Sequence, residues 1–535
     1  MPAALTYPGV YVEEIPSGVR TITGVATSIT AFIGRATRGA TDADADGPVT
    51  ITSFADFERT FGGLDPNYPM SYAVRDFYLN GGSKAVVVRL YAAGADPARA
   101  AIAIANLPLE AASPGAWGNT LCARIDSNVS ADVAASYGLT SADLFNLTVR
   151  DMDSGAQERF LNLTVKESPR RVDRVLKSGS TMIRVAASLT LPATTVPAAH
   201  GPAPANMTVW DDDASSTGVA TAANAADSAA LNDAAYLGNA AAKTGMHALK
   251  KVDLFNLMCI PPDIRSGTTS AAVYQAALSL CVDSRAMLIV DPPANWASVA
   301  TITAGNNAEL TALGLNGTAA RNAALFFPRV LQSDPKREGQ IDTFVPCGIV
   351  AGAMARTDVQ RGVWKAPAGI DAALNGVQGL AVGLTDGENG SLNPIAVNCL
   401  RSFPLIGPVI WGSRTMRGAD LLADEYKYVP VRRLALFIEE SLYRGTQWAV
   451  FEPNDEPLWS QLRLNLGAFM HNLFRQGAFQ GKTPQDAYFV KCDKETTTQN
   501  DINLGIVNIV VGFAPLKPAE FVVIKLQQMA GQIQA

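Results

Sequence analysis

The chain has 535 residues, and at about 150 residues per domain this length predicts roughly three or four domains. Hydrophobic residues make up 48% of the sequence and charged residues 17%, as in globular proteins. The 43 basic and 49 acidic residues leave a net charge of −6, which argues against a basic stripe for nucleic-acid phosphates. We therefore expect no direct nucleic-acid partner.

A local arginine cluster does not change this expectation. Arg170, Arg171 and Arg174 stand among Glu167 and Asp173, with no interleaved aromatic side chains on which bases could stack. We interpret the cluster as a solvated face.

The N-terminus carries no basic segment followed by an apolar stretch, and no apolar run approaches the roughly 18 residues that cross a bilayer. We expect the chain to be cytoplasmic at synthesis, without membrane insertion.

The cysteines indicate neither zinc nor disulfides. They are scattered, form no CxxC pair and in several cases have apolar neighbours, so we expect reduced and mostly buried thiols. The six are Cys122, Cys259, Cys281, Cys347, Cys399 and Cys492.

The first segment of the chain is extended. Pro8 and Pro16 bracket GVYVEEI, in which alternate side chains point to opposite sides. One side carries Val10 and Val12, and the other carries Tyr11, Glu13 and Ile15. Such a strand has unpaired backbone groups, so it needs a sheet of its own or of a neighbour.

The next residues predict an α/β domain with an insertion. Strands at 28–34 and 84–90 flank an acidic loop and helices at 54–62 and 71–82. Between 94 and 244 the composition shifts toward Ala, Ser, Thr and Asp, with short alternating runs separated by turns. This stretch predicts a mostly β module, with an Ala-rich end that forms loop and one helix.

From 252 onward the α/β pattern returns. An apolar strand at 253–262, a helix at 271–284 and an apolar strand at 285–293 have the spacing of a βαβ unit. A further helix begins near 349, and Pro367 and Gly369 mark its exit.

The last 120 residues are the most strongly patterned. Apolar residues at helical spacing predict amphipathic helices at 431–445 and 457–477. Strands are predicted at 505–513 and 520–528, and two prolines stiffen the connection between them. The final strand is apolar on both faces, which suits a central place in a sheet better than a free edge. Its apolar residues are Phe521, Val522, Val523, Ile524 and Leu526.

Only weak motifs for chemistry occur. Asp42, Asp44, Asp46 and Gly47 copy the opening of an EF-hand loop, but its twelfth position is Ser53, which has no carboxylate. These aspartates are a weak calcium candidate beside the simpler interpretation as a solvated acidic loop. Residues 476–483 resemble a P-loop, but the first glycine is out of register and a helix precedes it. No nucleophile, base and orienting group form a set, so we expect no catalytic residue and no cofactor.

Several segments resemble the contractile tail sheath family. They are YPGVYVEE near the N-terminus, SPGAWGN at 113–119, and the block from EYKYVPVRRLALFIEESLYRG through FEPNDEPLW and AYFVKCDKETTTQNDINLG to VGFAPLKPAEFVV. The apolar segments DLFNLMCIPP and AMLIVDPP add to the resemblance, whereas the inserted module does not. The family includes phage tails, tailocins and other phage-like contractile injection systems, and the resemblance leaves open which machine this is.

The resemblance implies a structural protein and not an enzyme. Subunits form hexameric rings around an inner tube, stack into a helical polymer, and contract without nucleotide to drive the tube through a target envelope. The implied partners are further copies of the chain, the inner tube protein, and baseplate and tail terminator or cap proteins. Both terminal arms add strands to sheets of neighbouring subunits. For the tube contact we suggest the polar side of the helix at 458–476, with Arg463 and Arg475.

Patterns and resemblance together predict an α+β multidomain fold. We expect an N-terminal strand-exchange arm at 1–22, a middle α/β domain at 23–93 and 245–410, and an inserted outer domain, mostly β, at 94–244. An inner, tube-facing α/β domain follows at 411–515 and a C-terminal arm at 516–535. Two alternatives are a cytoplasmic α/β hydrolase or nucleotide-binding enzyme, which lacks a catalytic set, and an adhesin-like binding protein, which the missing signal peptide opposes.

Overall fold

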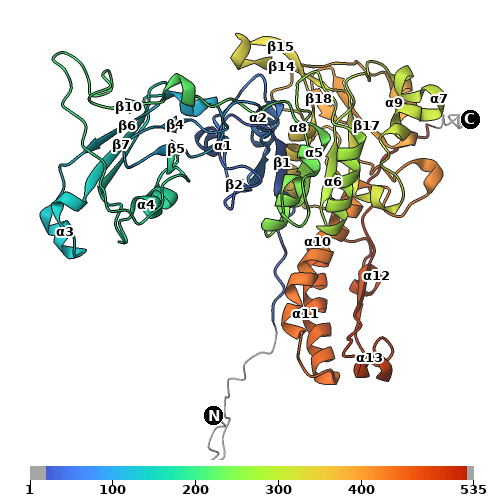
Figure 1. Ribbon diagram of the computed structural model, residues 1–535. Coiled ribbons are helices and arrows are strands. Elements are labelled where there is room, and N and C mark those ends of the chain that lie inside the picture. The colour runs from blue at the N-terminus through green and yellow to red at the C-terminus, as the bar shows by residue number, and fades with distance from the viewer. Residues whose placement is uncertain (1–19, 527–535) are drawn as a thin grey trace, which may run out of the picture. The chain divides into compact units, whose positions relative to one another are not determined.

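A computed structural model describes residues 20–526 of the chain (Figure 1). These residues divide into two compact units. Unit 1 comprises residues 20–27, 357–367 and 425–526, and unit 2 comprises residues 28–356 and 368–424.

Unit 2 is built on an eight-stranded sheet whose six inner strands are parallel. The two edge strands, β18 and β2, run antiparallel to their neighbours. In spatial order the strands are β18 (Gly407–Ile410), β17 (Val397–Phe403), β13 (Ala323–Phe327), β12 (Met287–Val290), β11 (Leu257–Cys259), β1 (Thr30–Gly34), β3 (Ala85–Arg89) and β2 (Val49–Ile51). The predicted βαβ unit is confirmed, because β11 and β12 pair in parallel and α6 (Ala271–Asp283) connects them.

The central strands are buried on both faces, as their continuous apolar runs predict. On one face Ile33, Val88 and Leu288 pack with side chains of α6 in a single apolar cluster. On the other face Phe32 contacts Phe77 of α2 (Pro69–Leu79), with ring centroids 5.6 Å apart. The sheet therefore separates two layers of helices.

The second helical layer depends on small residues. α8 (Cys347–Arg361) approaches α2 so closely that a Cβ on Gly348 would lie 2.0 Å from the carbonyl oxygen of Ala73. The sequence predicted this helix to continue toward Pro367, and this is wrong. α8 ends at Arg361 because Gly362 adopts φ 91°, the left-handed conformation that stops a helix, and donates its N–H to Asp358 O.

A smaller sheet and several helices complete this α/β part of unit 2. The sheet has three antiparallel strands in the order β15 (Gln340–Phe344), β14 (Val330–Asp334) and β16 (Gly379–Leu380). The helices are α1 (Phe54–Phe61), α5 (Asp233–Leu237), α7 (Val299–Ala312) and α9 (Asp386–Leu392), with 3₁₀ turns η4 (Gly245–Lys251), η5 (Thr318–Asn322), η6 (Pro335–Arg337), η7 (Asn393–Ile395) and η8 (Asp420–Leu422).

The stretch predicted to be a β module contains two small sheets and has an apolar cluster of its own, although helical turns and loops make up most of its residues. One sheet has the order β10 (Thr217–Gly218), β6 (Leu121–Asp126), β7 (Phe145–Asp151) and β8 (Gln157–Leu163), and another has the order β4 (Ala101–Ile102), β5 (Leu109–Ala111) and β9 (Ile183–Val185). The helical elements are α3 (Ala131–Ser136), α4 (Val172–Gly179), η1 (Ala116–Thr120), η2 (Ser141–Asp143) and η3 (Thr221–Ala223).

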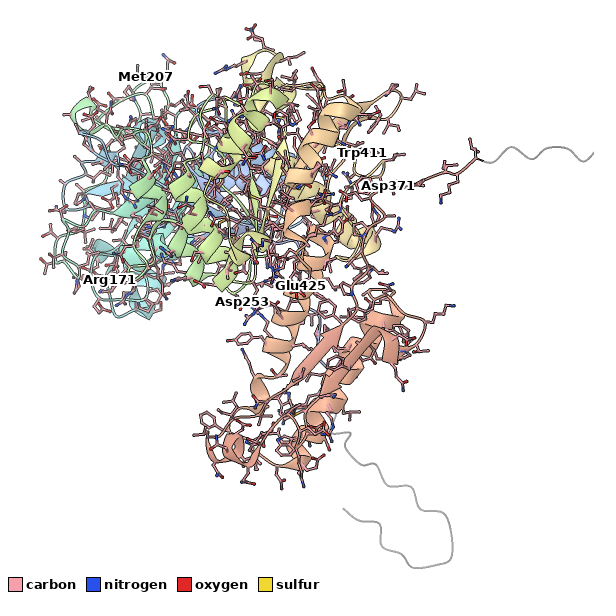
Figure 2. The ribbon with its side chains drawn as sticks, turned by 90° about the vertical axis from the view of Figure 1, so that its right-hand side faces the viewer. Arg171, Met207, Asp253, Asp371, Trp411 and Glu425 are labelled. Atoms are coloured by element: carbon pink, nitrogen blue, oxygen red, sulfur yellow. The ribbon has the colours of Figure 1, made fainter. Side chains whose placement is uncertain are left out.

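The arginine cluster lies in this module, where Figure 2 labels Arg171. Arg171 binds Asp173 at 2.8 Å and also Glu167, and only 14% of its side chain is exposed. Arg174 is half-exposed and binds Glu167 at 2.7 Å. Arg171 is therefore only partly solvated, because the partly exposed carboxylates of Glu167 and Asp173 bind its guanidinium.

Unit 1 is built on the two predicted amphipathic helices, which are confirmed as α10 (Val429–Gly445) and α11 (Glu456–Arg475). Their apolar faces form one cluster with Leu434, Ile438, Trp459 and Met470 at its centre. The remaining elements are α12 (Pro484–Ala487), α13 (Gln499–Asn503), η9 (Gln447–Ala449) and a two-stranded sheet of β19 (Tyr488–Lys491) and β20 (Val510–Phe513).

The six cysteines are free and buried, as expected. Within residues 20–526, no helix combines the length and the apolar character needed to span a membrane.

Candidate inter-subunit surface

Residues near both ends of the chain lie in unit 1. The N–H of Arg20 donates to Asn465 Oδ1 at 3.1 Å, and the Arg20 guanidinium lies 4.4 Å from the ring centre of Trp448. Further along, the N–H of Val25 donates to Ser441 Oγ at 3.2 Å. Residues 20–25 are thus held on α10 and α11, and Figure 1 shows this blue segment beside them. The preceding arm therefore starts from unit 1, although its predicted residues Val10, Tyr11, Val12, Glu13 and Ile15 lie outside the described part of the chain.

The C-terminal segment is held on unit 1 as far as residue 520. The N–H of Gln480 donates to Ala514 O at 2.9 Å, and Phe479 forms an antiparallel bridge with Pro515. The hydroxyl of Tyr428 then donates to Glu520 Oε2 at 2.9 Å. These contacts fix the point from which the C-terminal arm departs.

Beyond Glu520 the arm exposes large apolar side chains. Their exposed fractions run from 73% to 93%. The residues are Phe521, Val522, Val523, Ile524 and Leu526. Within the described residues this segment forms no strand, so the strand predicted at 520–528 is not made inside one chain as far as residue 526. A β-prone apolar segment without a covering layer is the form in which a strand is offered to another sheet.

The sheet of β19 and β20 has both of its edges unpaired among the described residues. Tyr488 pairs with Phe513 and Lys491 with Val510 in an antiparallel ladder, and one face of the pair packs on the apolar cluster of unit 1. A two-stranded sheet is marginal by itself and gains stability from further strands. Its open edges present the N–H and C=O groups that an added strand requires.

Of the two arginines suggested for the tube contact, one is bound within unit 1 and the other is exposed. Arg463 donates to Cys492 O and to Ser460 Oγ, and it binds Glu456, whose carboxylate raises the pKa of Arg463. Its guanidinium is therefore occupied within unit 1. Arg475, in the last turn of α11, is exposed. The sequence places both on the polar side of the helix but gives no sign of the Cys492 carbonyl, which lies 29 residues away.

The acidic loop at 42–46 is bound to the chain's own cations and N–H groups. Asp44 Oδ2 accepts hydrogen bonds from Thr41 N and Oγ1, and Asp42 Oδ2 accepts from Gly245 N at 2.6 Å. The Lys251 ammonium donates to the carbonyl oxygens of Asp42 at 2.8 Å and Asp44 at 3.0 Å. Residues 20–526, which include Asp46, contain no group of three or more His, Cys, Asp or Glu side chains that could hold a metal ion.

One titratable group escaped prediction from the sequence. Asp291, directly after β12, is buried, and its Oδ1 accepts the N–H of Cys347 at the start of α8 at 2.8 Å. Its Oδ2 has no partner within the described residues. Burial raises the pKa of Asp291 to about 7. The only sequence signal was an acidic residue directly after an apolar strand.

Comparisons with known proteins agree with this architecture. The family model for the phage tail sheath protein central domain matches residues 235–416, and the model for the phage tail sheath C-terminal domain matches residues 423–528. The tail sheath protein of Vibrio phage KVP40 is 30% identical over 127 residues. That match spans 24% of this chain and only 18% of the length of the phage protein.

Solved structures share the fold at low identity. The PVC sheath complex of an extracellular contractile injection system, in its contracted state, aligns with 98% of this chain and 99% of its own at 20% identity and a TM-score of 0.55. The sheath of the anti-feeding prophage in its contracted state aligns with 98% and 100% at 22% identity and the same score. The sheath tail protein of Listeria innocua aligns with 92% and 96% at 13% identity and a TM-score of 0.58. With both sheath domain models matched in order, the chain belongs to the phage tail sheath family.

Proposed function

We propose that this chain is a structural sheath subunit that polymerises as stacked hexameric discs around an inner tube and contracts to drive the tube through a target envelope. Conformational energy stored during assembly supplies the work, and neither nucleotide nor catalysis takes part. The observation that carries the proposal is the C-terminal arm, which is anchored as far as Glu520 and exposes apolar side chains beyond it.

Strand addition is the step that links subunits. The apolar residues of the C-terminal arm, Phe521 to Leu526, add to the sheet of β19 and β20 in one neighbour, and Val10 to Ile15 add from another. Main-chain hydrogen bonds supply affinity, and alternate side chains supply register. Because each chain both gives arms and receives them, the contact runs head to tail, and such contacts yield a helical polymer when they do not close.

The tube contact is proposed at the polar side of α11. Arg475 is exposed and available to an acidic tube surface, whereas Arg463 binds the carbonyl oxygen of Cys492 and so holds the chain directly after β19. Baseplate and terminator proteins meet the two ends of the polymer. Assembly takes place in the cytoplasm, and the product is part of a phage tail or contractile injection particle.

Electron microscopy and sedimentation of purified protein test the proposal. The full chain is expected to form helical tubes or six-fold discs, alone or with its tube protein. Deletion of residues 521–535 is expected to leave the melting temperature unchanged and to abolish tubes. Leu421→Asp is a matched control, because Leu421 in unit 2 is 99% exposed and lies outside the arm. Normal tubes from the deletion variant, or monomers from the full chain at high concentration with tube protein, would refute the proposal.

A further inference from the structure

A cavity of about 740 Å³ opens in unit 2 where parallel strands end. Arg35 follows β1 directly, residues 264–266 follow β11, Ala294 follows β12 and Arg329 follows β13. The chain passes from β1 to β3 on one side of the sheet, whereas β11, β12 and β13 extend to the other side. The cavity thus lies at the switch point of an open α/β sheet, the usual ligand crevice of such folds.

The charges that line the cavity are mostly positive. Four arginines and a single carboxylate, Asp342, contribute to its wall. The arginines are Arg35, Arg265, Arg329 and Arg337. Arg35 forms an ion pair of 2.6 Å with Asp263, a residue that does not line the cavity. The remaining positive charge of the wall therefore comes from the other three arginines.

Arg329 is buried and has no carboxylate in an ion pair within the described residues. Its hydrogen bonds go to the carbonyl oxygens of Arg265, Gly267 and Pro292. Carbonyl oxygens orient a guanidinium but carry no full negative charge. Arg329 therefore has no directly bound carboxylate among residues 20–526, and the buried Asp291 is the acidic group with which it interacts electrostatically.

Arg265 and Arg337 share their acidic partners. Nη1 of Arg265 lies 2.8 Å from Asp334 and 2.6 Å from Asp342, and Nη1 of Arg337 lies 3.2 Å from the same Asp342 oxygen. Only 11% of the Arg265 side chain is exposed, and among residues 20–526 its Nε and Nη2 have no hydrogen-bond partner. Buried donors without partners are rare and costly. Three guanidinium groups, of Arg265, Arg329 and Arg337, thus lie with two directly bound carboxylates, of Asp334 and Asp342.

We infer that this cavity receives an aspartate or glutamate side chain from a neighbouring copy of the chain. Guanidinium forks match carboxylates in geometry and charge. Pro66, Ile264 and Ala294 add apolar wall, which suits a segment of polypeptide better than a free ion. The chain, with 49 acidic against 43 basic residues, has carboxylates in excess to supply. The inference rests on the proposed function, because it requires the copies to assemble.

Thiol labelling measures whether assembly fills the cavity. Ile264→Cys places a reporter on the wall at a half-exposed position, and the six native cysteines are buried, so background labelling is low. Met152→Cys, at a similarly exposed position in the inserted module, is the control. We expect maleimide labelling of Ile264→Cys to slow about tenfold on assembly, since labelling requires an accessible thiolate. A preparation that never assembles contradicts the proposed function, whereas an assembled sample labelled at the unassembled rate contradicts only this inference.

Coupling by a carbodiimide tests for the carboxylate itself. Arg337→Lys keeps the charge and supplies an amine, which the reagent condenses with a contacting carboxylate to form an amide. We expect a covalent dimer on denaturing gels from the assembled variant, and none from the unassembled variant or from assembled Arg337→Ala. Coupling to Asp342 stays within one chain and gives no dimer. If the assembled Arg337→Lys variant gives no covalent dimer, the inference is wrong. It is also wrong if citrate, but not assembly, protects Ile264→Cys from maleimide labelling, because the cavity would then bind a free organic acid.

Discussion

The hydroxyl of Tyr428 donates a hydrogen bond of 2.9 Å to Glu520, although the two residues are 92 positions apart. Tyr428 immediately precedes α10, and Glu520 immediately precedes the exposed apolar residues of the C-terminal arm. The bond therefore marks the boundary between the part of the C-terminal segment that packs on its own unit 1 and the exposed apolar part for which we propose strand addition to a neighbour.

Removing this bond is expected to loosen the arm without unfolding the protein. Tyr428→Phe removes the donor, and the loss of one partly buried hydrogen bond costs about 1 kcal/mol locally. We expect faster amide hydrogen exchange over residues 514–520 at an unchanged global melting temperature. Tyr443→Phe, at an exposed tyrosine of α10, is the control. Equal exchange over 514–520 in wild type and Tyr428→Phe would show that other contacts hold the segment.

A buried ion pair in unit 1 is expected to matter far more for stability. Arg433 Nη2 lies 2.6 Å from Asp358, both side chains are less than 5% exposed, and Arg433 also donates to Thr27 O. Arg433→Ala leaves the carboxylate buried and unpaired, so we expect the free energy of unfolding to fall by about 3–5 kcal/mol. The double variant Arg433→Met with Asp358→Leu removes both charges and is expected to recover most of the loss. Chemical denaturation of the single and double variants measures these changes in the free energy of unfolding. If the losses of the two single variants simply add in the double variant, the pairing is contradicted.

The raised pKa of Asp291 predicts a pH dependence of stability. Its folded pKa of about 7 lies above the ordinary 3.8, so the folded protein keeps a proton that the unfolded chain releases between these values. The contribution of Asp291 is therefore fully favourable below about pH 4 and is lost as the pH rises to 7, by up to about 4 kcal/mol.

Asp291→Asn removes this titration. We expect its melting temperature relative to wild type to increase between about pH 4 and pH 7 and to level off above pH 7. Leu421→Asn is the control, because it replaces a side chain that is 99% exposed and does not titrate, so its difference from wild type is expected to stay constant with pH. A constant difference for Asp291→Asn as well would mean that the carboxylate is charged throughout.

Close packing of α8 on α2 predicts a steric effect at one glycine. A Cβ on Gly348 would lie 2.0 Å from Ala73 O, which is backbone and cannot turn aside. We expect Gly348→Ala to lower the free energy of unfolding by about 3 kcal/mol through overpacking. Gly387 in α9 has nothing within 4 Å of the same position, so Gly387→Ala is expected to stabilise slightly, by up to about 1 kcal/mol. Differential scanning calorimetry distinguishes the two, and equal effects would contradict the close approach.

The sequence predicts elements well where a pattern is local. The apolar runs of β11 and β12, and the helical spacing of α10 and α11, follow from side-chain periodicity alone. The end of α8 was predicted wrongly, because Gly362 stops the helix before Pro367 and Gly369, which had been expected to mark its exit. The docking of Arg20 on Asn465 could not be predicted, since it joins positions 445 residues apart. In the cavity, Arg35, Arg265 and Arg329 likewise follow separate strands of the eight-stranded sheet, and Arg337 lies in η6 between β14 and β15 of the smaller sheet, so the four meet only in the folded chain.

The placement of residues 20–25 and 514–520 on the same unit has a mechanical consequence. In a polymer joined through the two ends of each chain, tension enters and leaves every subunit by way of α10, α11 and the small sheet beside them. The inserted module of unit 2 contributes no residue to this linkage, so it is free to change in size or sequence without weakening the connection between the two ends.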